Sequence, residues 1–138
     1  MNNKTREASV EIAATPARVW QAITDAALTR QYYFDTDILS AWTPGARWTS
    51  EADGHLYLEG EVLEVEPERR LVQTFHVVDE EPANADPPSR VTWLLTRAGD
   101  GTLLRIVHED QPQATLDYTE GGWEHILAGL KVAAEGGA

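Results

Sequence analysis

The chain has 138 residues, a length typical of one folded domain, and 42% of its residues are hydrophobic. It contains no cysteine, which excludes disulfides, thiolate zinc sites and a cysteine nucleophile. Its 23 acidic and 11 basic residues give a net charge of −12, which disfavours nucleic acids and anionic membrane surfaces as partners.

The N-terminal segment, residues 1–7, lacks the apolar core of a signal peptide, and no later stretch approaches the roughly 20 apolar residues of a membrane span. We therefore expect a cytoplasmic protein that does not enter membranes. Residues Ala8–Ala13 alternate apolar and polar side chains, which predicts a strand. Two short helices are predicted next, because Thr15 followed by proline is typical of a helix start and Asp25 can cap a second helix over Ala26–Tyr33.

The middle of the chain has an apolar period of two, interrupted by turn signals, which predicts adjacent antiparallel strands. Six strands are predicted there: Thr36–Ser40, Arg47–Ala52, Leu56–Val65, Leu71–Val78, Arg90–Thr96 and Leu103–Glu109. The acidic, proline-containing segment Asp79–Ser89 is predicted to be either a surface loop or a lid over a pocket.

A long helix is predicted over Thr119–Glu135, where large apolar residues recur at helical spacing. Its second stripe contains Gly122 and Gly129, and a glycine in a helix costs roughly 1 kcal/mol relative to alanine. The cost predicts a bulky group close to the helix backbone, either a tryptophan of the sheet or a bound ligand. One strand, two helices, six strands and one helix predict an α+β fold, in which a curved antiparallel sheet packs on the C-terminal helix.

Four stretches of the chain resemble a known protein family. They are ATPARVWQAITD (14–25), GEVLEVEPERRL (60–71), SRVTW (89–93) and GGWEHILAGLK (121–131). The first resembles the helix-grip superfamily, also called START-like or SRPBCC. Together the four resemble the family named for homologues of the activator of the heat-shock protein 90 ATPase.

The resemblance implies a single helix-grip domain with its core at about residues 8–134. In this fold six or seven strands wrap around the long C-terminal helix. The resemblance also implies a cavity for lipophilic molecules between the sheet and that helix. Some relatives are cyclases or hydrolases, and the eukaryotic namesakes stimulate a chaperone ATPase.

His108 and Glu64 are the candidates for chemistry. Strand alternation places His108 on the same face as Leu104 and Ile106. Three interpretations stay open for it: a core histidine bonded to a neighbour, a ligand contact, or a general base. Glu64 lies in a strand with apolar residues on both faces, so it either points inward as a perturbed acid or is turned outward by a bulge near Gly60.

No H-E-x-x-H pair, G-x-S-x-G elbow, phosphate loop or dinucleotide fingerprint occurs, so no metal and no cofactor is expected. The sheet and the long helix instead carry many aromatic and apolar residues, which predicts a small-molecule site. The predicted ligand-binding residues are Trp48, Tyr57, Phe75, Trp93, His108, Trp123, Ile126 and Leu130.

Three functional hypotheses follow from the sequence. The first is binding of a hydrophobic or aromatic small molecule between sheet and helix, without catalysis. The second is a protein-interaction module of the chaperone-activator kind. The third is a cyclase- or hydrolase-type enzyme that uses His108 or Glu64 as acid or base. The expected partners are a lipophilic small molecule and, in the second hypothesis, a protein, and the chain is expected to be a monomer or a homodimer.

Overall fold

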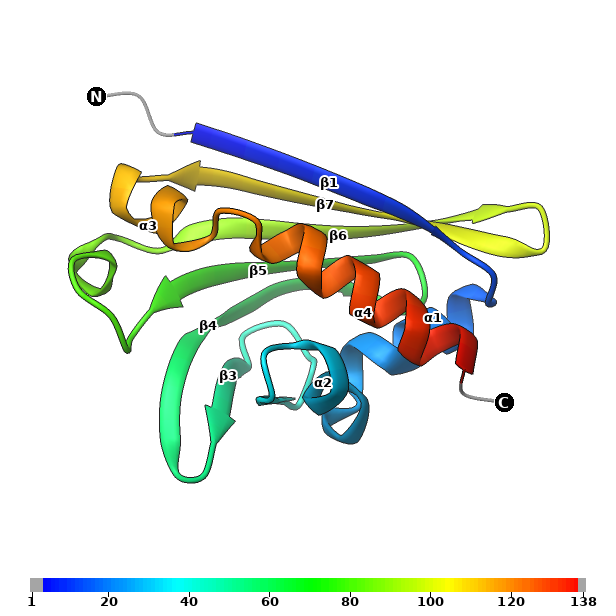
Figure 1. Ribbon diagram of the computed structural model, residues 1–138, viewed down its shortest axis with the longest axis horizontal. Helices are drawn as coiled ribbons and strands as arrows, with labels where there is room; N and C mark the ends of the chain where they lie inside the picture. The colour runs from blue at the N-terminus through cyan, green and yellow to red at the C-terminus, as the bar shows by residue number, and fades with distance from the viewer. Residues whose placement is uncertain (1–3, 137–138) are drawn as a thin grey trace.

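The computed structural model describes residues 4–136 and contains one seven-stranded antiparallel sheet, in the order β1-β7-β6-β5-β4-β3-β2. The strands are β1 (Lys4–Ile12), β2 (Asp37–Ser40), β3 (Arg47–Ala52), β4 (His55–Glu66), β5 (Arg70–Val77), β6 (Ser89–Ala98) and β7 (Gly101–Gln111). Figure 1 shows the sheet curving around helix α4 (Gly122–Gly136), which crosses its concave face. The predicted α+β helix-grip architecture is confirmed, with seven strands.

Two short helices, α1 (Pro16–Thr24) and α2 (Ala26–Tyr32), follow β1 and pack against α4 (Figure 1). The hydroxyl of Thr15 accepts a hydrogen bond from the backbone N–H of Arg18 at 3.2 Å, and a carboxylate oxygen of Asp25 accepts from that of Ala27 at 2.9 Å. These contacts satisfy backbone donors that the first turn of each helix leaves unpaired. Both predicted caps are confirmed.

The prediction of one C-terminal helix from Thr119 is wrong at its start. A separate helix, α3 (Gln113–Tyr118), precedes α4, and the turn between them contains Gly121 with φ +73°. A left-handed residue interrupts a helix, and glycine adopts that conformation without steric cost. The chain therefore changes direction where the apolar period alone suggests one continuous helix.

The segment between β5 and β6 packs as a surface loop against α3. One carboxylate oxygen of Asp86 accepts hydrogen bonds from the backbone N–H and the hydroxyl of Thr115, at 2.9 and 2.7 Å. A short 3-10 helix in the loop, Ala83–Ala85, buries the side chain of Ala83. The loop therefore packs against α3, which favours the prediction of a surface loop over that of a lid.

Gly129 in α4 allows the backbones of α4 and α2 to approach closely. A Cβ atom on Gly129 would lie 2.6 Å from the Cβ and 3.3 Å from the Cα of Tyr32. The bulky group next to this glycine is therefore a tyrosine of α2, so both predicted alternatives, a sheet tryptophan and a ligand, are wrong at Gly129. Gly122 differs, because a Cβ atom there would meet Phe34 Cζ at an ordinary 3.9 Å and nothing closer.

We expect Gly129→Ala to lower the free energy of unfolding by about 1–2 kcal/mol, because the displacement of α2 outweighs the gain in helix propensity. The matched change Gly122→Ala, at the first residue of the same helix, meets no such clash and should not lower stability. Urea unfolding followed by tryptophan fluorescence measures both. A Gly129→Ala protein as stable as the unchanged chain would contradict the close packing of these helices.

Candidate functional site

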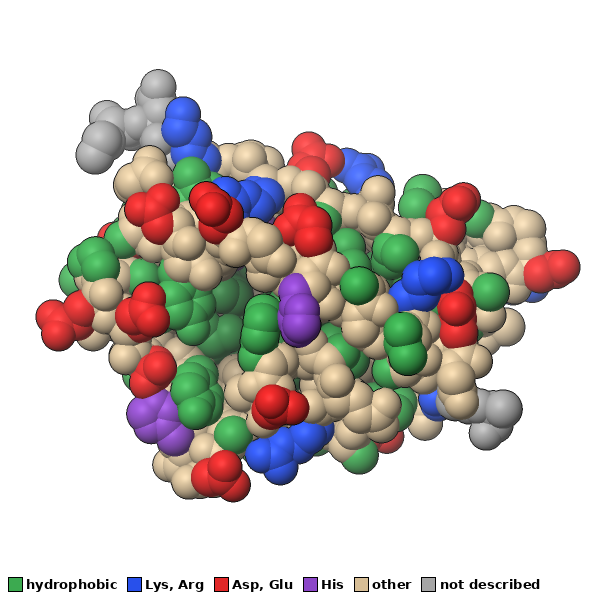
Figure 2. All heavy atoms as spheres, in the orientation of Figure 1, with side chains coloured by type: hydrophobic (Ala, Val, Ile, Leu, Met, Phe, Trp, Pro, Cys, Tyr) green, Lys and Arg blue, Asp and Glu red, His purple; other side chains and the backbone are tan. Residues whose placement is uncertain are grey.

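A hollow opens on the concave side of the sheet, beside the first turn of α4. Its volume is about 280 Å³, and an adjoining hollow of about 150 Å³ shares four of its lining residues. We call the two together the aromatic cavity. In Figure 2 a recess is visible that is lined by hydrophobic side chains and surrounded by acidic ones. The larger hollow is lined by Tyr33, Phe34, Leu58, Phe75, Tyr118, Thr119, Glu120, Gly122, Trp123 and Ile126.

Four different parts of the fold supply this lining. Strands β4 and β5 contribute the floor, α4 contributes Trp123 and Ile126, and the turn after α2 contributes Tyr33 and Phe34. The end of α3 contributes Tyr118. The rings of Tyr33 and Trp123 meet edge to face, with centroids 6.4 Å apart and planes at 88°. This is a favoured geometry for aromatic pairs, so the two walls of the cavity stabilise each other.

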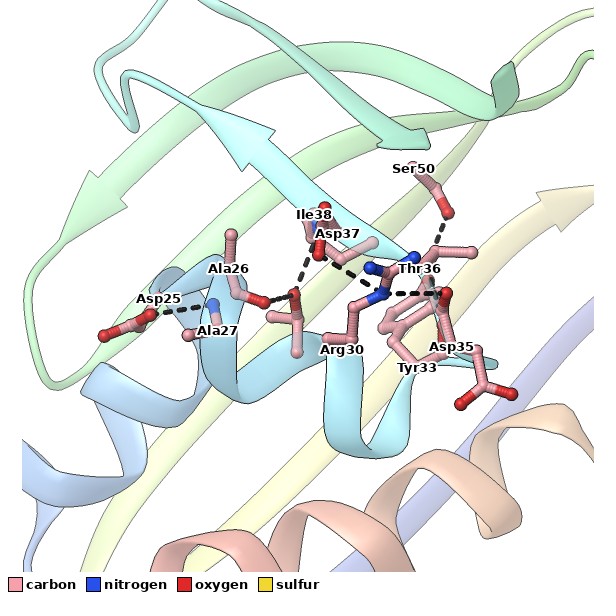
Figure 3. Close-up of polar contacts among 11 residues, drawn as sticks. Asp25, Ala26, Ala27, Arg30, Tyr33, Asp35, Thr36, Asp37, Ile38 and Ser50 are labelled. Atoms are coloured by element: carbon pink, nitrogen blue, oxygen red, sulfur yellow. Dashed lines mark hydrogen bonds and ion pairs between the residues drawn. The ribbon is translucent and has the colours of Figure 1, made fainter. Parts of the chain in front are cut away.

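The turn after α2 is held in place by a chain of hydrogen bonds from the sheet (Figure 3). Phe34 adopts a left-handed conformation with φ +54°, which is unfavourable for a bulky residue. The hydroxyl of Ser50 in β3 donates to the hydroxyl of Thr36 at 2.8 Å, and Thr36 donates in turn to the carbonyl of Tyr33 at 2.7 Å. These bonds fix the turn, and with it the two rings that line the cavity.

Three phenols border the aromatic cavity, those of Tyr33, Tyr57 and Tyr118, and the pKa of two of them is raised. Burial raises the pKa of Tyr33, with a smaller contribution from the neighbouring Tyr118. Burial also raises the pKa of Tyr118, and the nearby carboxylates of Glu80 and Asp79 raise it further. Both phenols are therefore protonated at neutral pH and can donate hydrogen bonds to an oxygen or nitrogen acceptor.

His108 is fully buried and does not line the aromatic cavity. The indole N–H of Trp123, which can only donate, lies 3.0 Å from Nδ1, so Nδ1 is unprotonated and the ring proton sits on Nε2. Nε2 donates to Ser89 Oγ at 2.7 Å, and that hydroxyl donates to the carbonyl of Phe75 at 3.3 Å. Burial, and secondarily the charge of Arg6, lower the pKa of His108 to about 3. The geometry thus favours the core-histidine interpretation over ligand contact or general base.

Glu64 points to solvent, so the inward-facing one of its two predicted alternatives is wrong. Its side chain is 54% exposed, and one carboxylate oxygen lies 3.8 Å from Nη2 of Arg70. The register of β4 against β5 shifts between Val62 and Glu64. Such a bulge inserts one extra residue and reverses the side to which the following residues point. The other alternative, a bulge near Gly60 that turns Glu64 outward, is the correct one.

The structure divides the eight predicted ligand-binding residues into two groups. Phe75, Trp123 and Ile126 line the larger hollow, and Tyr57 lines the adjoining one. The other four are core residues outside both linings: Trp48, Trp93, His108 and Leu130. A ligand-binding role for the first group remains a prediction.

The sequence reasoning missed Tyr33, Phe34 and Tyr118, which border both hollows. They were missed because they come from a turn and a short helix, where no period assigns side chains to a face. One signal was available: the run Tyr32-Tyr33-Phe34 places three consecutive aromatic rings at the end of a predicted helix. Not all three can be buried in one helix face, so one or more must meet another surface.

The model of the family described as "Activator of Hsp90 ATPase homolog 1-like protein" matches residues 13–135. The chain belongs to this family. Protein MLL2253 from Mesorhizobium loti is 30% identical with a TM-score of 0.76, and the alignment covers 94% of this chain and 96% of that one. No curated protein matches the chain.

Two less similar structures share the fold of this family member. CalU16 from Micromonospora echinospora is 24% identical, with a TM-score of 0.78 and coverage of 96% of this chain and 76% of that one. An HSP90 activator from Plasmodium falciparum is 18% identical, with a TM-score of 0.77 and coverage of 93% and 94%. Within residues 4–136 no helix is long and apolar enough to cross a membrane. In the same range no three His, Cys, Asp or Glu side chains gather as a metal site would require.

Proposed function

We propose that the aromatic cavity binds a hydrophobic or aromatic small molecule. The observation that carries this proposal is the open volume of about 280 Å³ on the concave face, continued by a further 150 Å³. Small-molecule sites typically have roughly 300–1,000 Å³, mostly apolar walls and a few polar groups that orient the ligand. The phenols of Tyr33 and Tyr118 and the carboxylate of Glu120 would be the orienting groups.

Binding without catalysis is favoured over the cyclase or hydrolase hypothesis. That hypothesis relied on His108 and Glu64 as acid or base. Both ring nitrogens of His108 are engaged by protein groups, and Glu64 lies on the solvent side of β4. A general base must reach the proton that it removes, and neither residue borders the cavity.

Filling the cavity from α4 is the direct test of this function. A Cβ atom at Gly122 meets no atom closer than 3.9 Å, so Gly122→Leu should project a side chain into the hollow without disturbing the helix. We expect this change to weaken binding of the neutral fluorescent probe N-phenyl-1-naphthylamine about tenfold or more, a loss of about 1.4 kcal/mol. A fluorescence titration measures the dissociation constant.

The matched control is Ala128→Leu, which adds the same side chain to the solvent face of the same helix. This variant should bind the probe as the unchanged protein does. Equal binding by Gly122→Leu would show that the probe sits elsewhere, and absence of binding by the unchanged protein would refute the proposed function. Native mass spectrometry of freshly purified protein gives an independent readout, because a co-purifying small molecule appears directly as added mass.

Protein interaction is the second candidate function, and two exposed apolar side chains favour it. Phe34 is 54% and Leu39 is 43% exposed, and both belong to the region from the α2 turn to the edge strand β2. An Hsp90 ATPase assay tests this candidate in the form that the family description suggests. If the chain stimulates the Hsp90 ATPase and Leu39→Glu removes that stimulation, the candidate is supported. If the ATPase rate stays unchanged at a saturating concentration of the chain, the candidate is contradicted.

A further inference from the structure

Within residues 4–136, the charged side chains that line the aromatic cavity and a neighbouring hollow are all acidic. Glu120 lines the larger hollow, and Glu80 and Asp117 line a neighbouring hollow that Tyr118 also borders. No lysine or arginine within residues 4–136 is among the residues that line these hollows. The acidic side chains around the recess are visible in Figure 2. A ligand in the cavity therefore lies in a negative potential.

The walls of the cavity add a second preference for positive charge. Six of its lining residues are aromatic: Tyr33, Phe34, Tyr57, Phe75, Tyr118 and Trp123. The face of an aromatic ring is the negative end of its quadrupole, and it attracts an ammonium group within about 6 Å of its centroid. The attraction strengthens where water is excluded, as it is beside the buried Trp123.

The basic side chains close to the cavity are committed to other partners. The guanidinium of Arg6 donates to the carbonyl of Leu116 at 3.2 Å and to the hydroxyl of Thr119 at 3.3 Å. His55 is hydrogen-bonded to Asp79, and its ring meets that of Tyr57 at 4.5 Å. The ring of His125 stacks on that of Phe34, with centroids 4.7 Å apart. Within residues 4–136, no lysine or arginine lines the aromatic cavity to receive an anionic ligand.

We infer that the aromatic cavity selects a cationic amphiphile, an amine or quaternary ammonium on an aromatic or alkyl body, over neutral and anionic molecules of the same size. This inference rests on the proposed function and specifies its ligand class. The apolar body would lie between Phe75, Trp123 and Ile126, and the ammonium group would face Glu120 and the ring of Tyr118. A carboxylate in the same place would meet like charge.

Three ligands of one skeleton test this selectivity: naphthalen-2-ylmethylammonium, naphthalen-2-ylmethanol and 2-naphthoate. Isothermal titration at pH 7.5 measures the dissociation constant of each ligand. We expect the ammonium to bind about fivefold more tightly than the alcohol, and the alcohol about fivefold more tightly than the carboxylate. The advantage of the ammonium should shrink in 0.5 M salt, because the part due to surface charge is screened.

A single carboxamide substitution provides the residue-level test. Glu120→Gln should weaken binding of the ammonium about threefold and binding of the alcohol less, because the amide oxygen can still accept a hydrogen bond from a hydroxyl but carries no charge. The control Glu66→Gln removes the same charge from the exposed end of β4 and should alter neither. Equal affinity for ammonium and alcohol, or tightest binding of the carboxylate, would overturn the inference while the proposed function stands. Failure of all three ligands to bind would overturn both.

Discussion

Acidification from pH 7 to pH 4.5 is expected to lower the free energy of unfolding by about 2–3 kcal/mol through His108 alone. Burial lowers the folded-state pKa of His108 to about 3, whereas an unfolded histidine titrates near its ordinary value of 6.5. Between these values the unfolded chain binds a proton that the native side chain does not accept. The contribution of His108 to the free energy of unfolding is therefore fully present above about pH 6.5 and is lost progressively as the pH falls toward 3.

The change His108→Gln isolates this contribution from the carboxylates, which titrate in both proteins. A glutamine amide can accept from Trp123 and donate to Ser89, but it does not titrate. Urea unfolding at a series of pH values from 7 to 4.5 gives the stability of each protein. The difference in free energy of unfolding between the unchanged protein and the variant should shrink by about 2–3 kcal/mol as the pH falls from 7 to 4.5.

The same experiment separates the two interpretations of His108 that matter for function. A stability difference that stays constant with pH would mean that native His108 takes up a proton as easily as the unfolded chain. That behaviour is expected of an accessible general base and not of a histidine with both nitrogens engaged. The expected narrowing would therefore also argue against the enzyme hypothesis.

The fold could be predicted because local patterns and global architecture agree in this chain. Period-two alternation correctly placed His108 on one face with Leu104 and Ile106, all three of which are buried. The caps at Thr15 and Asp25 located the starts of α1 and α2. Glu64 could not be placed, because a bulge one residue earlier decides the side to which it points. The partner of Gly129 could not be identified either, since Tyr32 meets it only in the tertiary structure.

The cavity itself was predictable only in part, and the reason is physical. Alternation identifies residues of the inner face, but it does not distinguish a side chain that packs on another from one that borders open volume. Trp93 meets Trp123 edge to face at 5.6 Å and gives its indole N–H to Gln73 at 2.7 Å, so it contributes to the core. Phe75, on the neighbouring strand, borders the hollow. Phe75 differs from Trp93 because the turn after α2 leaves the volume beside Phe75 unfilled.

Replacing Gly60 by alanine is expected to lower the free energy of unfolding by about 3 kcal/mol or more. A Cβ atom there would lie 2.1 Å from the carbonyl oxygen of Thr74 and 2.3 Å from Nε1 of Trp48. These two atoms share a hydrogen bond of 2.7 Å that passes directly over the glycine. The alanine must therefore separate β4 from β5, expel the indole, or both.

A double-mutant cycle with Trp48→Leu shows which of these responses dominates. If the alanine expels the indole, part of its effect is already present in Trp48→Leu, and the double variant should be more stable than the sum of the single changes predicts by about 1–2 kcal/mol. Strict additivity in urea unfolding would instead assign the whole loss to the clash with the backbone of β5.

The consequence of Gly60→Ala should extend to the aromatic cavity. The ring of Trp48 packs against Phe75 with centroids 6.1 Å apart, and Phe75 forms part of the cavity wall. If the indole moves, Phe75 loses its support and the cavity loses its shape, so the affinity for N-phenyl-1-naphthylamine should fall together with stability. A destabilised Gly60→Ala protein that binds the probe normally would show that the shape of the cavity does not depend on the packing of Trp48 against Phe75.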